Sequence, residues 1–232
     1  MKNIFTVILF SLSFYALGQD KIEGIGPFKI GQSNIKIIEN IASELNIKVI
    51  RSNKSSDLDY PHSKSLIVEI ETNLENAKGI SEKASHCPFV IVYYISKYQV
   101  SGIELQSLFL TFRDEVLIKL ETEWYFEIAK AIETKYGPGF KETRRIESDC
   151  PTSDNNSSYI GVQRLVTWRN NDILAATYTS VVYDKACHIN TSRGFFIEQP
   201  SKAIGLNLCE RQGWLKAEAI KTKKEKESLK DF

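Results

Sequence analysis

After its first eighteen residues, the sequence has no apolar run that approaches the roughly twenty residues of a transmembrane helix. It also lacks the short motifs of common catalytic and nucleotide sites, because no G-x-S-x-G, H-E-x-x-H, P-loop or G-x-G-x-x-G pattern occurs. From these absences we predict no transmembrane segment, no metal, no cofactor and no catalytic residue set.

The chain also has almost no excess charge of either sign. Its 30 Lys and Arg residues balance 29 Asp and Glu residues, and loss of Lys2 with a leader peptide would leave 29 of each. A neutral protein has no long-range field to attract an anionic polymer or surface. The composition therefore predicts neither nucleic acid nor an anionic membrane as a partner.

The first eighteen residues are typical of a secretory signal peptide. Lys2 supplies a positive charge, residues 4–16 form an uncharged apolar run, and the small residues Ala16 and Gly18 precede the expected cleavage site. The run is too short for a stable membrane span, which disfavours a membrane anchor, and the abrupt change to polar residues disfavours a buried strand. We predict a periplasmic or secreted mature chain that begins at Gln19. No cysteine lies near the cut, so lipidation of an N-terminal cysteine is not expected.

The length and composition suit one ordinary domain. We expect residues 1–18 to be the signal peptide, residues 19–212 to form a single α+β domain, and residues 213–232 to form a charged helical tail. The tail has few apolar anchors, so it is expected to be a solvated end of the chain.

The apolar spacing predicts two main helices, over residues 33–46 and 123–136. Ser33 is expected to cap the first helix, and Gly137 and Pro138 to end the second. Alternating and β-branched residues predict strands at 27–30, 47–50, 65–71, 89–95, 100–105, 107–112, 116–120, 159–168, 173–182 and 194–198. The predicted fold class is α+β, an antiparallel sheet with both helices packed on it and a charged helical tail.

Four cysteines are the most informative side chains in the sequence. An even number of cysteines in an exported protein favours disulfides, and four allow three connectivities. The cysteines are Cys87, Cys150, Cys187 and Cys209.

A hairpin around Asn170 and Asn171 narrows the connectivity. Both residues tolerate positive φ, and with both as the turn, facing positions sum to 341. Cys150 and Cys187 then lie at the open end of the hairpin, a few residues out of register. Loop ends can close that gap to the Cα separation of about 5.5 Å that a disulfide needs. The favoured pair is therefore Cys150–Cys187, and the other two cysteines pair by elimination.

Two adjacent pairs, His86-Cys87 and Cys187-His188, offer an alternative reading as a Cys₂His₂ metal site. Adjacent residues on a strand point to opposite faces and rarely bind one ion together. Disulfides are therefore favoured over a metal site, over a reactive thiol beside a histidine, and over free thiols that have no role.

Two short stretches resemble patterns in known exported proteins. Residues 28–33, with the sequence FKIGQS, are similar to the strand–Gly–helix opening of the SmpA/OmlA class of outer-membrane assembly lipoproteins. A hairpin, a helix that ends in residues 135–138 (KYGP) and a Trp-bearing strand resemble uncharacterised secreted proteins of Gram-negative bacteria, Bacteroidetes especially. The resemblance implies an envelope compartment and an α+β fold, and it carries over no functional residue.

The leading functional hypothesis is a non-catalytic binding or envelope-associated module, whose partner is an unidentified envelope or extracellular protein. It follows from the missing nucleophile and metal-ligand sets, which a hydrolase of this size usually shows. A third hypothesis is a secreted inhibitor that presents the loop 51–63.

The rival to the leading hypothesis is an enzyme with a dispersed site. Its candidate groups are His86, His188, Asp57 and Asp59. His62 shares a loop with both aspartates, but a solvated loop of turn-forming residues explains that stretch better than a metal or acid–base site.

Overall fold

The computed structural model describes residues 21–52, 65–71, 83–123, 126–151 and 158–228. The expected signal peptide lies outside these ranges, as do Asp57, Asp59 and His62. Most of the loop 51–63 lies outside them as well.

The main feature is one nine-stranded sheet with the order β3-β4-β5-β6-β7-β11-β10-β9-β8, and a two-stranded sheet pairs β1 with β2. The strands are β1 (Gly24–Ile25), β2 (Phe28–Lys29), β3 (Val49–Ser52), β4 (Ile67–Ile70), β5 (Val90–Val100), β6 (Ile103–Arg113), β7 (Val116–Thr122), β8 (Phe140–Pro151), β9 (Ser158–Asn170), β10 (Ile173–Tyr183) and β11 (Ile189–Glu198). The described helices are α2 (Ile37–Glu44), α3 (Phe126–Tyr136) and α4 (Pro200–Ser228).

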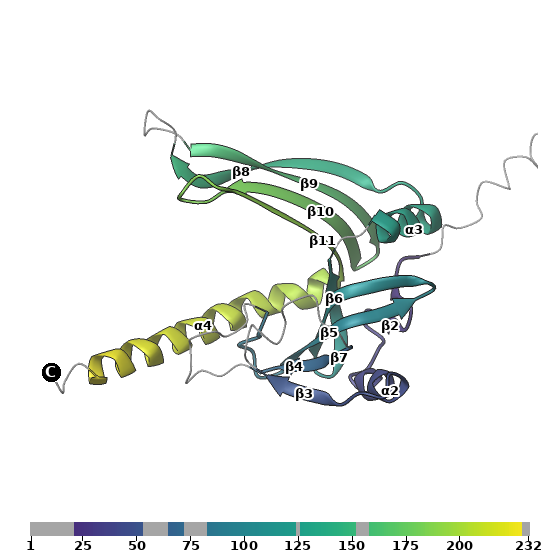
Figure 1. Ribbon diagram of the computed structural model, residues 1–232, viewed down its shortest axis with the longest axis horizontal. Helices are drawn as coiled ribbons and strands as arrows, with labels where there is room; N and C mark the ends of the chain where they lie inside the picture. The colour runs from purple at the N-terminus through teal and green to yellow at the C-terminus, as the bar shows by residue number, and fades with distance from the viewer. Residues whose placement is uncertain (1–20, 53–64, 72–82, 124–125, 152–157, 229–232) are drawn as a thin grey trace, which may run out of the picture.

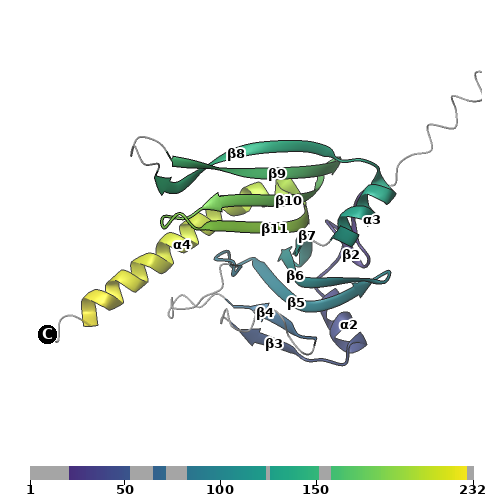
Figure 2. The same cartoon turned by 45° about the horizontal axis from the view of Figure 1, so that its top comes forward.

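The large sheet has two parts, which we call the base (β3–β7) and the arm (β8–β11). Only four residue pairs join β7 to β11, from Phe195↔Thr122 to Glu198↔Lys119. Figures 1 and 2 show the arm as a layer of long strands that extends away from α3, with α4 leaving the junction beneath it. The outer end of the arm, at the left in Figure 1, carries the β8–β9 and β10–β11 connections.

Tight turns join the strands of the base. Val100 pairs with Ile103, so Ser101 and Gly102 form a two-residue turn, and both have positive φ. The β6–β7 turn likewise places its two residues at positive φ. Turns of this kind match the right-handed twist of the strands that they join.

The two faces of the sheet bury two separate clusters. On the face covered by α2 and α3, an unbroken row crosses six strands from β5 to β9, made of Tyr93, Leu110, Leu120, Ile197, Ala175 and Trp168. On the opposite face, Val68, Val92 and Tyr94 pack against Leu206 and Cys209 of α4. Side chains alternate between the faces along each strand, so consecutive residues serve different clusters.

The predicted fold class is wrong. The structure is mostly β, with 49% of residues in strands and 26% in helices. The sheet is mixed, because β3 pairs parallel with β4. A third helix, α4, packs on the face opposite to α2 and α3, so the architecture is not two helices on an antiparallel sheet. Periodicity does not report strand direction, and the connection from Ser52 to Ile67 is long enough for the crossover that a parallel pair requires.

The first helix begins later than expected. Ser33 does not cap it: the Ser33 hydroxyl accepts a hydrogen bond from the Lys29 amide at 2.8 Å and donates one to the Pro27 carbonyl at 2.9 Å. The side chain therefore closes the turn after β2. Helix α2 starts at Ile37, after an Asx turn in which Asn34 Oδ1 accepts from the Lys36 amide at 3.0 Å.

Helix α4 begins thirteen residues before position 213, where the helical tail was expected to start. Pro200 occupies its first position, where a missing amide hydrogen does no harm. Asp172, in the β9–β10 turn, accepts hydrogen bonds from the Ser201 amide at 3.2 Å and from the Ser201 hydroxyl. The hydrogen bond from the Ser201 hydroxyl is the main cause that lowers the pKa of Asp172.

Candidate functional site

The four cysteines form two disulfides, Cys87–Cys209 and Cys150–Cys187, which are the two pairs favoured by the sequence. Their Cα separations are 5.7 Å and 4.9 Å. The first disulfide fastens α4 to the base. The second joins the end of β8 to the β10–β11 connection at the outer end of the arm.

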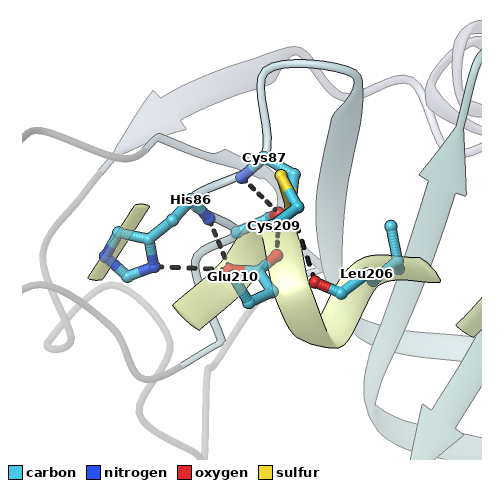
Figure 3. Close-up of polar contacts among 6 residues, drawn as sticks. His86, Cys87, Leu206, Cys209 and Glu210 are labelled. Carbon is cyan, nitrogen blue, oxygen red and sulfur yellow. Dashed lines mark hydrogen bonds and ion pairs between the residues drawn. A yellow bond between two sulfur atoms is a disulfide. The ribbon is translucent and has the colours of Figure 1, made fainter. Parts of the chain in front are cut away.

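A cluster of polar contacts surrounds the Cys87–Cys209 disulfide (Figure 3). The Glu210 carboxylate accepts hydrogen bonds from the Ser85 hydroxyl and, at 2.7 Å, from the His86 amide. His86 Nδ1 lies 3.4 Å from the same carboxylate. We call Ser85, His86, Cys87, Cys209 and Glu210 the α4 latch.

The α4 latch joins a histidine to a carboxylate, one of the arrangements that an enzyme would need. However, the Ser85 hydroxyl donates to Glu210, so the serine and the histidine share one acceptor instead of forming the chain that activates a nucleophile. Both hydrogen-bond donors and His86 Nδ1 converge on one carboxylate. The geometry therefore fits a structural role, in which the base holds α4.

The structure does not bring His188 to this cluster, and the other two enzyme candidates, Asp57 and Asp59, lie outside the described residues. His188 lies in the β10–β11 connection, where its Nδ1 is 3.5 Å from Asp184. Asp184 also accepts hydrogen bonds from the amides of His188 and Ala186, at 2.9 Å each, and the first of these is the main cause that lowers its pKa. Within the described ranges, no group of three or more His, Cys, Asp or Glu side chains is placed to hold a metal ion.

A cavity of about 240 Å³ lies between the β1–β2 hairpin, the β5–β6 turn and α3. We call it the α3 cavity. It is lined by Ile22, Gly24, Ile25, Gly26, Val100, Ser101, Ile103, Leu105, Ile128, Ala131, Ile132, Lys135, Tyr136 and Ile197. Aliphatic side chains dominate the wall, so the space favours an apolar guest.

Glycine shapes the side of the cavity formed by the hairpin. A Cβ atom at Gly24 would lie 1.8 Å from the Phe28 carbonyl oxygen, so only glycine lets the two short strands come this close. Gly26 has a φ of +54°, and a Cβ atom there would lie 2.8 Å from Val100. Asn170 Nδ2 donates to the Ile22 carbonyl at 3.2 Å and ties the start of the hairpin to the arm.

Helix α3, the opposite wall, is fixed at its C-terminal end. Trp168 Nε1 donates a 2.8 Å hydrogen bond to the Gly137 carbonyl, directly after the last helical residue, Tyr136. Ile128 and Ile132 are buried on the side of α3 that faces the sheet. The wall is therefore held by packing along the helix and by a hydrogen bond at its end.

The polar side chains of the lining are few. Ser101, Lys135 and Tyr136 supply them, and Lys135 Nζ lies 5.1 Å from the centre of the Tyr136 ring. Among the residues that the structure describes, the lining includes no histidine, cysteine or carboxylate. This composition suits binding of an apolar body with one polar end.

Sequence patterns identify neither the α3 cavity nor the role of Glu210 in the α4 latch. The cavity residues come from the hairpin, the β5–β6 turn, α3 and β11, and each is an ordinary core residue in its own segment. The sequence of residues 135–138, KYGP, predicts the end of a helix, but it does not predict that Lys135 and Tyr136 line a cavity. Comparison of the chain with models of protein families, with curated proteins and with solved structures gives no match.

Proposed function

We propose that this chain is an exported, non-catalytic binding module that holds a small apolar group in the α3 cavity. The observation that carries the proposal is the cavity itself, whose described lining is predominantly aliphatic and includes Lys135. Apolar cavities with a few placed polar groups are the usual form of small-molecule sites in proteins.

The cavity volume limits the guest. A dry apolar cavity of about 150 Å³ accepts benzene, with six carbons, so by proportion the α3 cavity suits a guest of about ten carbon atoms. Lys135 in the lining favours a guest with an anionic end. A medium-length acyl chain with a carboxylate meets both conditions.

Export is part of the proposal. The two disulfides are typical of proteins from oxidising compartments. Among the described helices, none combines the length and apolar composition needed to cross a membrane. Together with the signal-peptide pattern, these features support work in the periplasm or outside the cell. N-terminal sequencing of material from an exporting host should begin at Gln19, and an intact Met1 would contradict export.

The binding proposal is tested by calorimetric titration of the mature protein with decanoate, and with decanol as the neutral probe. Ala131 lines the cavity yet is exposed, so Ala131→Trp places a large ring at its mouth without disturbing the core. Thr134→Trp is the matched control, because Thr134 is exposed on the same helix and is not part of the lining. We expect Ala131→Trp to weaken binding more than tenfold and Thr134→Trp to leave it within twofold.

A second variant tests the orientation of the guest. Lys135→Met should weaken decanoate binding several-fold and leave decanol binding unchanged. Equal losses with both tryptophan variants, or no binding of either probe by the folded wild type, would contradict a ligand site at α3.

A further inference from the structure

The net charge of the chain conceals an uneven distribution on the arm. On the α3 side of the arm, the register places Thr143, Arg164, Thr179 and Arg193 side by side on β8, β9, β10 and β11. Adjacent strands are about 4.8 Å apart, so the Cα atoms of the two arginines are separated by about 10 Å. Threonine lies between them on the same face.

Two more cations flank this row. Lys141 and Arg145 lie two residues on either side of Thr143, so each is a diagonal neighbour of Arg164 at about 7 to 8 Å. All four cationic side chains are exposed, and none has a carboxylate partner among the residues that the structure describes. We call Lys141, Arg145, Arg164 and Arg193 the basic row.

Exposed aliphatic side chains lie on the same face, farther toward the outer end of the arm. Ile160 is four residues from Arg164 on β9, and Ile189 is four residues from Arg193 on β11, so both share the face of the basic row. They are 53% and 63% exposed. Tyr183 pairs with Ile189 and adds a ring with a polar end.

The outer end of the arm is held in one shape. The Cys150–Cys187 disulfide joins the end of β8 to the β10–β11 connection, and Cys150 is fully buried. Asp184 organises the same connection by accepting the amides of Ala186 and His188. The two isoleucines therefore belong to a braced surface.

We propose that this face of the arm docks on an anionic lipid bilayer. Ile160 and Ile189 enter the boundary between headgroups and acyl chains, and the basic row binds lipid phosphates behind them. Guanidinium groups suit phosphate oxygens because they offer two parallel donors. Adjacent apolar and basic groups are the features that hold peripheral proteins at such surfaces.

Net neutrality does not prevent this docking. Screening limits electrostatic attraction to about 8 Å at physiological salt, so a lipid surface responds to the charges that face it and not to the total. Among the described strand residues on this face of the arm, Glu147, which pairs with Ile160, is the one acidic residue, and Asp184 lies beyond the strands in the β10–β11 connection. The four cations therefore leave the face with a positive excess. The exposed isoleucines favour a bilayer over a soluble polyanion, because a soluble polyanion has no apolar interior that could bury them.

The test is flotation of the mature, oxidised protein with vesicles of phosphatidylglycerol and phosphatidylethanolamine, compared with phosphatidylcholine vesicles. We expect the protein to bind the anionic vesicles and to bind the neutral ones little. Binding to the anionic vesicles should decrease several-fold between about 50 and 500 mM salt, because the Debye length shortens several-fold over this range. The double variants Ile160→Ser/Ile189→Ser and Arg164→Gln/Arg193→Gln should each reduce vesicle binding at least tenfold.

Matched controls lie elsewhere on the surface. Ile204→Ser/Leu208→Ser removes two aliphatic side chains of α4 that are 71% and 65% exposed, and Arg144→Gln removes a cation from the other face of β8. Both should bind vesicles like the wild type. The proposal is overturned if the wild type does not float, or if the controls lose as much binding as the arm variants. It is also overturned if Ile160→Ser/Ile189→Ser binds vesicles like the wild type while dextran sulfate, a soluble polyanion, binds the wild type and not Arg164→Gln/Arg193→Gln. The result is independent of the α3 cavity, because no residue is shared.

Discussion

The His86 amide donates a 2.7 Å hydrogen bond to the Glu210 carboxylate (Figure 3). His86 directly precedes Cys87, Glu210 directly follows Cys209, and these two cysteines form a disulfide. Noncovalent and covalent contacts thus hold the same turn of α4 to the base. Gly213 completes the approach, because a Cβ atom there would lie 2.4 Å from the His86 Cβ atom.

The two disulfides should contribute unequally to stability. Their sequence separations are 122 and 37 residues, and the chain-entropy relation assigns about 5 kcal/mol to Cys87–Cys209 and about 4 kcal/mol to Cys150–Cys187. Urea unfolding of the variants Cys87→Ser/Cys209→Ser and Cys150→Ser/Cys187→Ser measures the difference. A larger loss for the shorter loop would contradict the entropic account.

Removal of the latch carboxylate should loosen α4. Glu210→Ala removes the acceptor that the Ser85 hydroxyl and the His86 amide share, so we expect a loss of about 1 to 3 kcal/mol in the free energy of unfolding. Amide hydrogen exchange in the first half of α4 should become faster. Glu218→Ala, on an exposed position of the same helix, is the control and should change neither quantity.

Loss of one hydrogen bond from Trp168 should weaken the wall of the α3 cavity. Trp168→Phe keeps most of the buried ring but leaves the Gly137 carbonyl without its indole donor, at an expected cost of about 1 to 3 kcal/mol. Decanoate binding should fall with stability, because the end of α3 is released. Thermal unfolding and calorimetric titration of one sample test both effects, and unchanged values in both would rule out this anchoring role.

Stability should depend on pH through Glu121. Its carboxylate is 2.7 Å from Lys83 Nζ and 3.0 Å from Lys119 Nζ. Burial acts to raise the pKa of Glu121, but attraction by Lys119 and then Lys83 outweighs it, so the pKa is lowered. A lowered carboxyl pKa stabilises the fold above the unfolded-state pKa of about 4.3, and this contribution is lost as the pH falls through the folded-state pKa.

The variant Glu121→Gln isolates that contribution. At pH 7 we expect it to be less stable than the wild type by about 1 to 2 kcal/mol, with the difference shrinking below about pH 4.3. Unfolding curves at a series of pH values measure the gap. Glu133→Gln, at an exposed position of α3, should leave the pH profile unchanged. A gap that widens in acid would show that the two lysines do not act on this carboxylate.

The sequence patterns located most strands of the base, since their residues alternate or are apolar on both faces. They missed β8 entirely. Its residues, such as Lys141, Arg144 and Arg145, are mostly charged and exposed, because β8 is an edge strand of the arm. An edge strand of this kind has no apolar periodicity to detect, and its charges protect it from pairing with other chains.

The hairpin between β9 and β10 was expected and is present, but its register differs. Asn170 pairs with Ile173, so the turn residues are Asn171 and Asp172 instead of Asn170 and Asn171. Asn171 has the positive φ that the turn requires. Asp172 instead anchors the start of α4 through Ser201, and this tertiary contact is not visible in a local pattern.

Local sequence by itself determined the C-terminal end of α3 and the preference for two disulfides, because helix stops and cysteine number act over short distances or in the unfolded chain. Tertiary structure decided what lies together: the parallel pairing of β3 with β4, the docking of α4, the α3 cavity and the basic row. These depend on strand order and register, which set how segments distant in sequence align their faces. A neutral sequence can therefore carry a basic surface, and core residues from four segments can enclose one cavity.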